Sequence, residues 1–210
     1  NNSATVILAK QFPGSRLHLA HRLDRETSGV LLFAKSPRCA AIFMKQFSER
    51  EVRKEYWALV SGRVAFKRKI VDLALGYDDH EVRVRQRVFT DGTGQAAKTE
   101  LGLLAAGESL SLVRAVPKTG RLHQIRVHLA WLGHPVIGDK IYTGEGEAFL
   151  KIWSGAAEPE DLEALGASRQ MLHARKLQIS HPETGRKILL EAPLPPDFVS
   201  CLKDAGLALP

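Results

Sequence analysis

A polar loop runs directly into an apolar segment at residues 21–34, which read His21-Arg22-Leu23-Asp24-Arg25-Glu26-Thr27-Ser28-Gly29-Val30-Leu31-Leu32-Phe33-Ala34. The apolar run Val30–Ala34 is typical of a strand that is buried on both faces. A loop held by such a rigid element is where catalytic groups concentrate, and Asp24 is the candidate here. The same loop equally fits a structural role, in which Asp24 caps a turn and Thr27 and Ser28 satisfy backbone groups.

The rest of the chain predicts more strands than helices. Ser36-Pro37 supplies an N-cap and a first-turn proline for a helix over residues 37–49, with Ala40, Phe43, Met44 and Phe47 facing the core. Strands are predicted over residues 56–60, 82–88, 110–116, 178–180 and 187–190, and helices over 121–132 and near 161–165, the last within an exposed insertion at 144–168. We therefore expect an α+β fold with a mixed, mainly antiparallel sheet flanked by helices and loops.

The composition indicates a basic, single-domain protein without a membrane-spanning segment. The chain has 210 residues, which suits one large domain, and its net charge of +7 points to a polyanionic partner such as RNA or DNA. Cys39 and Cys201 lack metal-ligand spacing and are expected to be reduced structural thiols. No run of about 18 apolar residues is present, and residues 1–5 do not resemble a signal peptide.

Arginine and valine alternate over residues 82–88, which is the period of a half-buried strand. Two interpretations are open for Arg83, Arg85 and Arg87. They form either a solvated sheet face or a stripe that contacts phosphates, and we favour the solvated face because arginine is common on exposed strands.

The predicted helix over residues 121–132 carries a charged residue beside its apolar face. Arg126 follows Leu122 by four residues and precedes Leu129 by three, so it borders the apolar side. A guanidinium beside an apolar face is stabilised by a carboxylate partner, and Asp24 is the candidate for that partner. Such a pair would keep Asp24 ionised, as a nucleophile or base requires.

Histidines 123, 128 and 134 raise the question of a metal site. Their spacings of five and six residues do not bring them to one helical face. We therefore expect no metal, and assign these histidines to RNA contacts or helix packing.

Together the motifs resemble the RluA family of pseudouridine synthases. Residues 21–29 match the family signature H-R-L-D-x-x-T-S-G in full, and residues 119–128 match T-G-R-x-H-Q-I-R-x-H. Residues 54–62 are similar to K-x-Y-x-A-x-V-x-G, and the family's later segments follow in order at Gly133–Lys140, Leu172–Ala174 and Glu191–Pro193. The related RsuA-type enzymes carry G-R-L-D-x-x-T-E-G, so His21 and Ser28 decide against them.

Two departures from the family pattern are visible. The K-P-x-G strand and turn that usually precede the catalytic loop are missing, so we expect a single pseudouridine synthase catalytic domain over residues 1–210 that lacks its N-terminal segment. A further N-terminal RNA-binding domain is left open. After Asp139 the family's tyrosine-glycine pair is interrupted, as Tyr142-Thr143-Gly144.

The resemblance implies isomerisation of specific uridines in structured RNA to pseudouridine, with ribosomal RNA favoured over transfer RNA and with no cofactor and no metal. It implies catalytic roles for Asp24, Tyr56 and Arg126: the essential carboxylate, the pocket tyrosine that stacks on uracil, and the residue that orients Asp24. Leu172 would wall the pocket, and Arg22 and His123 would contact phosphates. We expect a cytoplasmic monomer. The alternatives are an RNA-binding relative without catalysis and a metal-dependent phosphoesterase that uses the histidines.

Overall fold

A seven-stranded sheet organises the chain, for which a computed structural model describes residues 3–209. The strand order is β11-β10-β4-β9-β8-β5, and β2 pairs with β10 off this path. Every pairing in the sheet is antiparallel except that of β2 with β10, which confirms the predicted α+β, mainly antiparallel fold. The single domain expected over residues 1–210 includes residues 1, 2 and 210, which lie outside the described residues.

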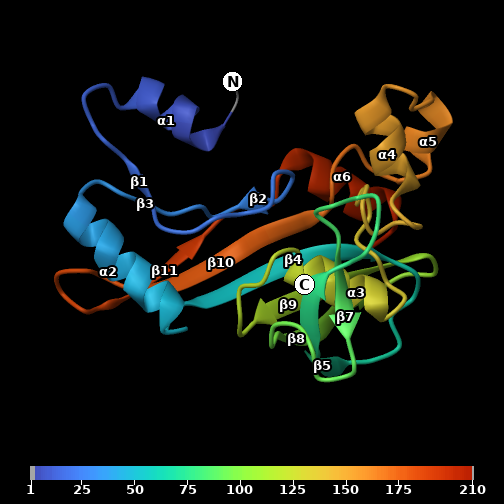
Figure 1. The fold of residues 1–210 in the computed structure, drawn as a ribbon, viewed down its shortest axis with the longest axis horizontal. Coiled ribbons are helices and arrows are strands. Elements are labelled where there is room, and N and C mark those ends of the chain that lie inside the picture. The colour runs from blue at the N-terminus through green and yellow to red at the C-terminus, as the bar shows by residue number, and fades with distance from the viewer. Residues whose placement is uncertain (1–2, 210) are drawn as a thin grey trace.

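Figure 1 labels the helices and strands in the order in which they follow one another along the chain. The sheet strands are β2 (Ser28–Gly29), β4 (Arg53–Ser61), β5 (Arg68–Asp72), β8 (Lys98–Ala106), β9 (Leu110–Pro117), β10 (Leu172–Ser180) and β11 (Lys187–Glu191). Two small pairs are β1 (His18–Leu19) with β3 (Phe33–Ala34), and β6 (Ala74–Tyr77) with β7 (Gln86–Phe89). The helices are α1 (Ala4–Gln11), α2 (Pro37–Ser48), α3 (Gln124–Trp131), α4 (Glu147–Ser154), α5 (Pro159–Glu163) and α6 (Pro196–Asp204).

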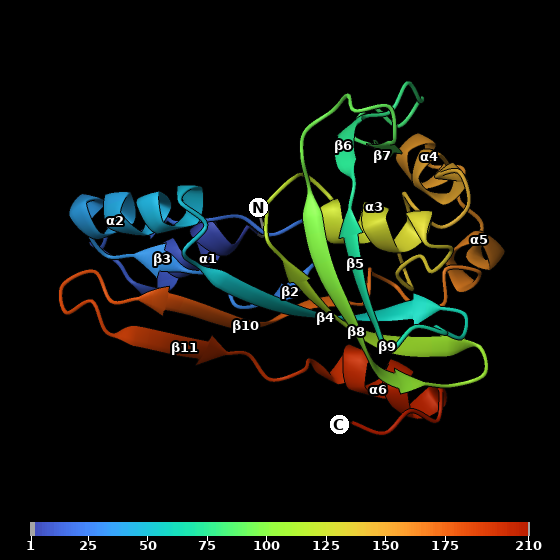
Figure 2. The same cartoon turned by 90° about the horizontal axis from the view of Figure 1, so that it is seen from below.

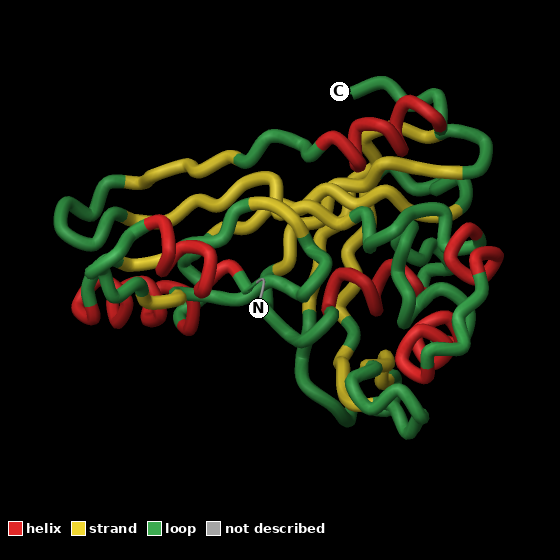
Figure 3. The backbone as a smooth tube through the Cα atoms, turned by 90° about the horizontal axis from the view of Figure 1, so that it is seen from above, coloured by secondary structure: helices red, strands yellow, loops and turns green. Residues whose placement is uncertain are grey.

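The two faces of the sheet are covered differently (Figure 2). One face carries α2 with the β1–β3 pair at one end and α3 with β6, β7, α4 and α5 at the other, while α6 covers the opposite face. The tube view in Figure 3 shows the same two groups of helices on one side of the strands. Consecutive residues Ala58, Leu59 and Val60 of β4 are all buried, as expected for a strand covered on both faces.

Helix α2 begins as predicted. The Ser36 side chain accepts a hydrogen bond from the Cys39 N–H at 3.2 Å, and Pro37 occupies the first turn. The prediction that Met44 faces the core is wrong, because its side chain is 57% exposed. Gln46 is buried instead. Its side chain exchanges two hydrogen bonds with the Ser180 backbone, which connects α2 to the end of β10.

The continuous strand predicted over Val30–Ala34 is wrong. Gly29 pairs with β10, the chain then leaves that sheet, and only Phe33 and Ala34 form a strand, which pairs with β1. One segment therefore serves two sheets, and the intervening Val30 and Leu32 pack partly buried on the α2 cluster. Of this segment only Ala34 is fully buried and the other four residues are partly buried, so the apolar run predicted neither complete burial nor the change of pairing partner.

Two other predicted elements are shorter than expected. Helix α3 begins at Gln124 instead of residue 121, because His123 is left-handed with φ 54°. The strand predicted over residues 82–88 is formed only from Gln86 onward, as β7. Arg85 turns instead to ion pairs with Asp78 and Glu145, so the alternating arginine stripe is not formed.

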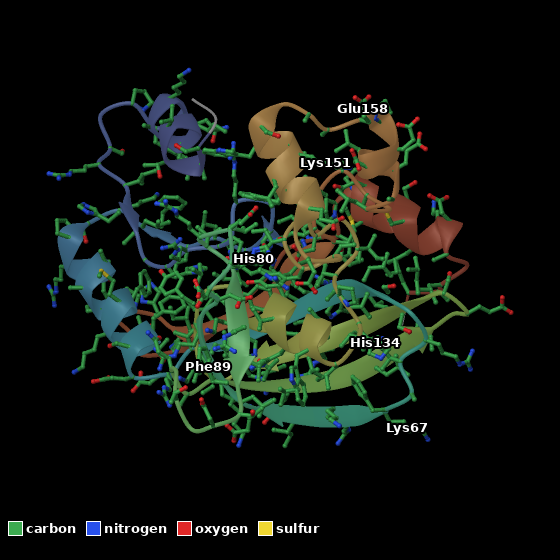
Figure 4. The ribbon with its side chains drawn as sticks, turned by 45° about the vertical axis from the view of Figure 1, so that its right-hand side comes forward. Lys67, His80, Phe89, His134, Lys151 and Glu158 are labelled. Atoms are coloured by element: carbon green, nitrogen blue, oxygen red, sulfur yellow. The ribbon has the colours of Figure 1, made fainter. Side chains whose placement is uncertain are left out.

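The insertion at residues 144–168 contains two helices. Helix α5 matches the one predicted near residues 161–165, shifted by two residues, whereas α4 was not predicted because Gly146 at its N-cap offers no side-chain cap. An ion pair between Lys151 and Asp161 joins the two helices. Figure 4 labels Lys151 on α4 and Glu158 at the start of α5.

The remaining predicted elements are confirmed, namely β4, β9 and the hairpin of β10 with β11. Among the described helices, none is long and apolar enough to cross a membrane.

Gly29 is the residue on which the parallel β2–β10 pair depends. Its φ is +112°, and an added Cβ would lie 2.2 Å from the Ala174 carbonyl oxygen. We expect Gly29→Ala to lower the free energy of unfolding in urea by more than about 3 kcal/mol. Gly14→Ala is the matched control: Gly14 also has positive φ but nothing lies within 4 Å, so only the backbone cost of about 1–2 kcal/mol should appear. Equal losses in both variants would contradict the prediction.

Candidate active site

A cleft with a volume of about 580 Å³ opens between the two groups of elements that share one face of the sheet. One wall comes from residues 20–27 and 47–56, the other from residues 117–125, and Leu172 also contributes. Five of the six predicted site residues line it: Asp24, Tyr56, Arg22, His123 and Leu172. The sixth, Arg126, lies behind the cleft wall and is 4% exposed.

Arg126 makes the predicted ion pair with Asp24, with its Nη1 3.1 Å from Oδ2. It also makes a two-point contact with a residue that sequence reasoning missed, since Nε and Nη2 donate to the two carboxylate oxygens of Asp139 at 2.6 and 2.8 Å. Burial disfavours the charge of Arg126, but the two carboxylates outweigh this effect and raise its pKa above the ordinary value. The guanidinium is therefore permanently charged.

The two carboxylates have different surroundings. Asp139 is fully buried, and its Oδ1 also accepts hydrogen bonds from the backbone N–H groups of Ile141 and Tyr142. The Asp24 side chain is 22% exposed and lines the cleft. Asp139 is thus committed to holding Arg126, while Asp24 remains available to a bound molecule. The signal that could have found Asp139 is the donor count of arginine, which one carboxylate cannot satisfy.

The loop that carries Asp24 is held in place by three side-chain contacts to residues outside the cleft lining. Thr27 accepts a hydrogen bond from the Gln170 side chain at 2.6 Å, Ser28 lies 2.9 Å from His173 Nδ1, and Glu26 pairs with Lys140 at 2.6 Å. The hydroxyls of Thr27 and Ser28 therefore have a structural role, but their partners are the buried side chains of Gln170 and His173 instead of the expected backbone groups. The consequence is a fixed position for the carboxylate between them.

The opposite wall is held by a buried network around Gln124. Its side chain donates to Thr99 at 2.9 Å and accepts from Thr119 at 2.6 Å and from the Arg121 N–H at 3.1 Å. His128 also contacts Thr99, at 2.9 Å, so Gln124 and His128 share a face as the helical spacing predicted. This network fixes the turn at residues 119–123, which lines the cleft.

Tyr56 lies at the floor of the cleft on β4, between β9 and β10. Burial, and secondly the charge of Asp24, raise the pKa of its hydroxyl. Tyr56 therefore stays protonated at neutral pH. Burial also lowers the pKa of Lys54, whose Nζ donates to the Thr119 carbonyl oxygen at 3.2 Å across the cleft.

The charge of the cleft favours an anionic ligand. Among the described residues that line it, Asp24 is the single carboxylate, and five side chains are basic: Arg22, Arg50, Lys54, Lys118 and Arg121. Arg22, Arg50 and Lys118 are exposed, so their charges can reach phosphates outside the cleft. A basic cleft around one fixed carboxylate suits a nucleic acid whose reacting part enters the cleft.

The histidines are dispersed among separate partners. His128 contacts Thr99 and the Leu73 carbonyl, His134 contacts the Ser61 carbonyl, and His123 contacts Tyr142. Within residues 3–209 no three His, Cys, Asp or Glu side chains are placed to hold a metal ion.

Comparison with known proteins places the chain in a family. The family model described as RNA pseudouridylate synthase matches residues 5–131, which is more than half of the chain. The chain belongs to the RNA pseudouridylate synthase family. The relatives named below support the RluA branch that the motifs indicated.

Relatives within this family align over most of the chain. An RNA pseudouridine synthase of Bacillus subtilis is 39% identical over 181 residues, covering 85% of this chain and 53% of that protein. Ribosomal large subunit pseudouridine synthase D of Neisseria meningitidis serogroup A is 36% identical over 196 residues, covering 91% of this chain and 50% of that protein. The chain thus spans about half the length of these curated relatives.

Solved structures agree with this family assignment. Human RNA pseudouridylate synthase domain containing 4 superposes with a TM-score of 0.75 at 30% identity, covering 97% of this chain and 82% of that one. Human RNA pseudouridylate synthase domain containing 1 gives 0.73 at 31% identity, with 92% and 76% covered.

The two carboxylates around Arg126 should differ in their effect on stability. We expect Asp139→Asn to lower the free energy of unfolding by about 3–5 kcal/mol, because it leaves a buried guanidinium without its two-point partner. Asp24→Asn should cost only about 1–2 kcal/mol, since Arg126 keeps its two-point contact with Asp139 and the altered side chain is partly exposed in the cleft. Urea unfolding of both variants measures the difference, and losses of equal size would show that Asp139 has no special anchoring role.

Acid should destabilise the protein through its buried histidines. Burial, with the charge of Lys54 beside His21 and of Arg126 beside His123, lowers the pKa of each to about 4. The unfolded chain takes up these protons below about pH 6.5, so stability is complete above that pH and is lost as pH falls toward 4. At pH 5 we expect a loss on the order of 1–2 kcal/mol for each histidine, measured by urea unfolding. Equal stability at pH 5 and pH 7 would contradict this.

Proposed function

We propose that this chain is an RNA pseudouridine synthase that isomerises specific uridines in structured RNA, with Asp24 as its catalytic carboxylate. The observation that carries the proposal is the placement of Asp24. It is the single carboxylate among the described lining residues, and its Oδ2 is held by the buried guanidinium of Arg126. A carboxylate fixed in this way lies beside the space that a nucleotide would occupy.

The reaction breaks the bond from uracil N1 to the ribose anomeric carbon and forms a bond from uracil C5 to the same carbon. The C5 hydrogen leaves as a proton, and N1 gains one. Asp24 acts either on the anomeric carbon or as a base on the sugar, and both routes require the ionised form. The base must leave its stack to enter the cleft, whose volume of about 580 Å³ lies within the range of small-molecule sites.

Tyr56 and Leu172 would hold the base. Tyr56 presents its ring beside Asp24, and because its hydroxyl stays protonated, it acts as a stacking surface and a hydrogen-bonding group. Leu172 is 3% exposed and supplies an apolar wall of the cleft. Arg126 touches no substrate in this scheme, since it acts by orienting Asp24.

The exposed basic residues would position the RNA. Arg22, Arg50 and Lys118 stand at the cleft and would contact phosphates. Ribosomal RNA is favoured over transfer RNA because relatives carry the name ribosomal large subunit pseudouridine synthase. We also propose that residues 1–210 act as one catalytic domain, supported by the single seven-stranded sheet whose strands lie between Ser28 and Glu191. We propose further that the protein is a cytoplasmic monomer.

Two rival functions are less well supported. A relative that binds RNA without catalysis would most simply have lost Asp24, Tyr56 or Arg126, and all three are present and gathered at the cleft. A metal-dependent phosphoesterase needs histidines that converge, whereas these contact separate partners.

The proposal is tested by Asp24→Asn with RNA that carries tritium at uridine C5, because each turnover releases that tritium to water. We expect release to be abolished while RNA affinity stays within a few-fold, since a neutral amide removes the reacting charge but no basic contact. Asp91→Asn, in the exposed turn at residues 91–94, is the matched control and should react as wild type does. Tritium release by Asp24→Asn at a rate near that of wild type would contradict the assignment of Asp24 as the catalytic carboxylate. Pseudouridine mapping in total RNA from cells with and without the protein would then identify the target.

A further inference from the structure

A second buried polar pair adjoins the cleft and is not explained by the ion pair of Arg126. Tyr142 is 6% exposed, and its hydroxyl accepts a hydrogen bond from the Gln86 N–H at 2.9 Å. The same hydroxyl lies 2.9 Å from Nδ1 of His123, a residue that lines the cleft. The two rings meet edge to face with centroids 5.6 Å apart.

The direction of these bonds follows from donor counting. A tyrosine hydroxyl has one proton to give, and the Gln86 N–H can only donate to it. Among residues 3–209 the structure offers that proton no acceptor except His123 Nδ1. A buried hydroxyl proton left without an acceptor is costly, so the hydroxyl donates to Nδ1. Nδ1 is then unprotonated, and the proton of the neutral ring resides on Nε2.

Burial favours the neutral form of the ring, and the neighbouring charges act in both directions. Arg126 on α3 and Arg22 on the loop oppose a positive charge, while Asp24 and Asp139 favour one. Burial is the largest effect, and it lowers the pKa of His123 to about 4. The guanidinium of Arg126 also lies 5.0 Å from the ring centre of Tyr142.

We propose that Tyr142 is a positioning residue that fixes His123 as the Nε2–H tautomer, and that His123 uses this N–H to bind a carbonyl oxygen of the base in the cleft. This inference rests on the proposed function. It also revises the expectation that His123 contacts phosphate, because a neutral imidazole brings no charge to a phosphate and releases no counterion.

A fixed donor of this kind suits uracil. Uracil presents carbonyl oxygens at positions 2 and 4, whereas cytosine has an amino group at position 4 that can only donate. A site built around an N–H that cannot change its tautomer rejects a facing amino group, because both donors would be left unpaired. The hairpin of β6 and β7, which supplies Gln86, thereby contributes to base recognition without touching the base.

The tautomer is tested directly by nitrogen-15 NMR of the histidine side chains, with the His123 signals assigned by their loss in His123→Asn. We expect an unprotonated Nδ1 and a protonated Nε2 that do not change between pH 5.5 and 9. In Tyr142→Phe this fixed pattern should be lost, whereas in Tyr77→Phe, whose tyrosine is 68% exposed on β6, it should persist. A protonated Nδ1 in the wild type would overturn the proposal.

The binding role is tested by His123→Asn, because asparagine tolerates the left-handed backbone of residue 123 and lacks the Nε2 donor. With ribosomal RNA as the probe, we expect the slope of log affinity against log salt to match wild type, while Arg22→Ala flattens it by about one unit. Tritium release should show kcat/KM reduced at least about tenfold in His123→Asn. A slope flattened by one in His123→Asn, or unchanged kcat/KM, would overturn the proposal. If wild type itself released no tritium, the proposed function would fail, and the NMR and salt measurements would still decide the tautomer and the charge of the contact.

Discussion

The buried guanidinium of Arg126 constrains the rest of the site. Removing its charge from water is costly, and that cost is met only when carboxylates of the right geometry surround the planar fork. Asp139 takes one edge of the fork and Asp24 takes a remaining nitrogen. The position of Asp24 is therefore set by α3 and by the segment after Gly138, far away in sequence. The ties at Thr27, Ser28 and Glu26 then keep its loop where this ion pair needs it.

Neutral histidines complete this arrangement. His128 and His173 each connect a hydroxyl to a backbone carbonyl, with one ring nitrogen facing each. His21 accepts from the Leu32 N–H and stacks on Phe47, which fixes the start of the loop that carries Asp24 against α2. At His128 and His173 the imidazole is a rigid link between a hydroxyl and a carbonyl oxygen, and at His21 protonation of Nε2 would remove the acceptor of the Leu32 N–H.

Local signals in the sequence predicted much of this fold. Ser36-Pro37 marked the start of α2, turn residues marked the ends of β4 and β9 and the β10–β11 hairpin, and the charge of Arg126 beside an apolar face predicted its pairing with Asp24. What failed depended on tertiary contacts. The change of strand partner after Gly29, the exposure of Met44 and the left-handed turn at His123 are imposed by distant segments. Asp139 carried no local sign of its role because its partner is thirteen residues away.

The β-bulge in β10 between Ala174 and Lys176 has a mechanical consequence. On one side of it, β10 and β4 support α2 through Leu177, Ile179 and Val52; on the other, they join the core beneath α3. Both walls of the cleft thus pack on the same two strands, β4 and β10, and the bulge lies between the two packing regions. Because a bulge bends its strand and increases its twist, it sets the spacing of the walls. The width of the cleft is in this way tied to the curvature of the sheet.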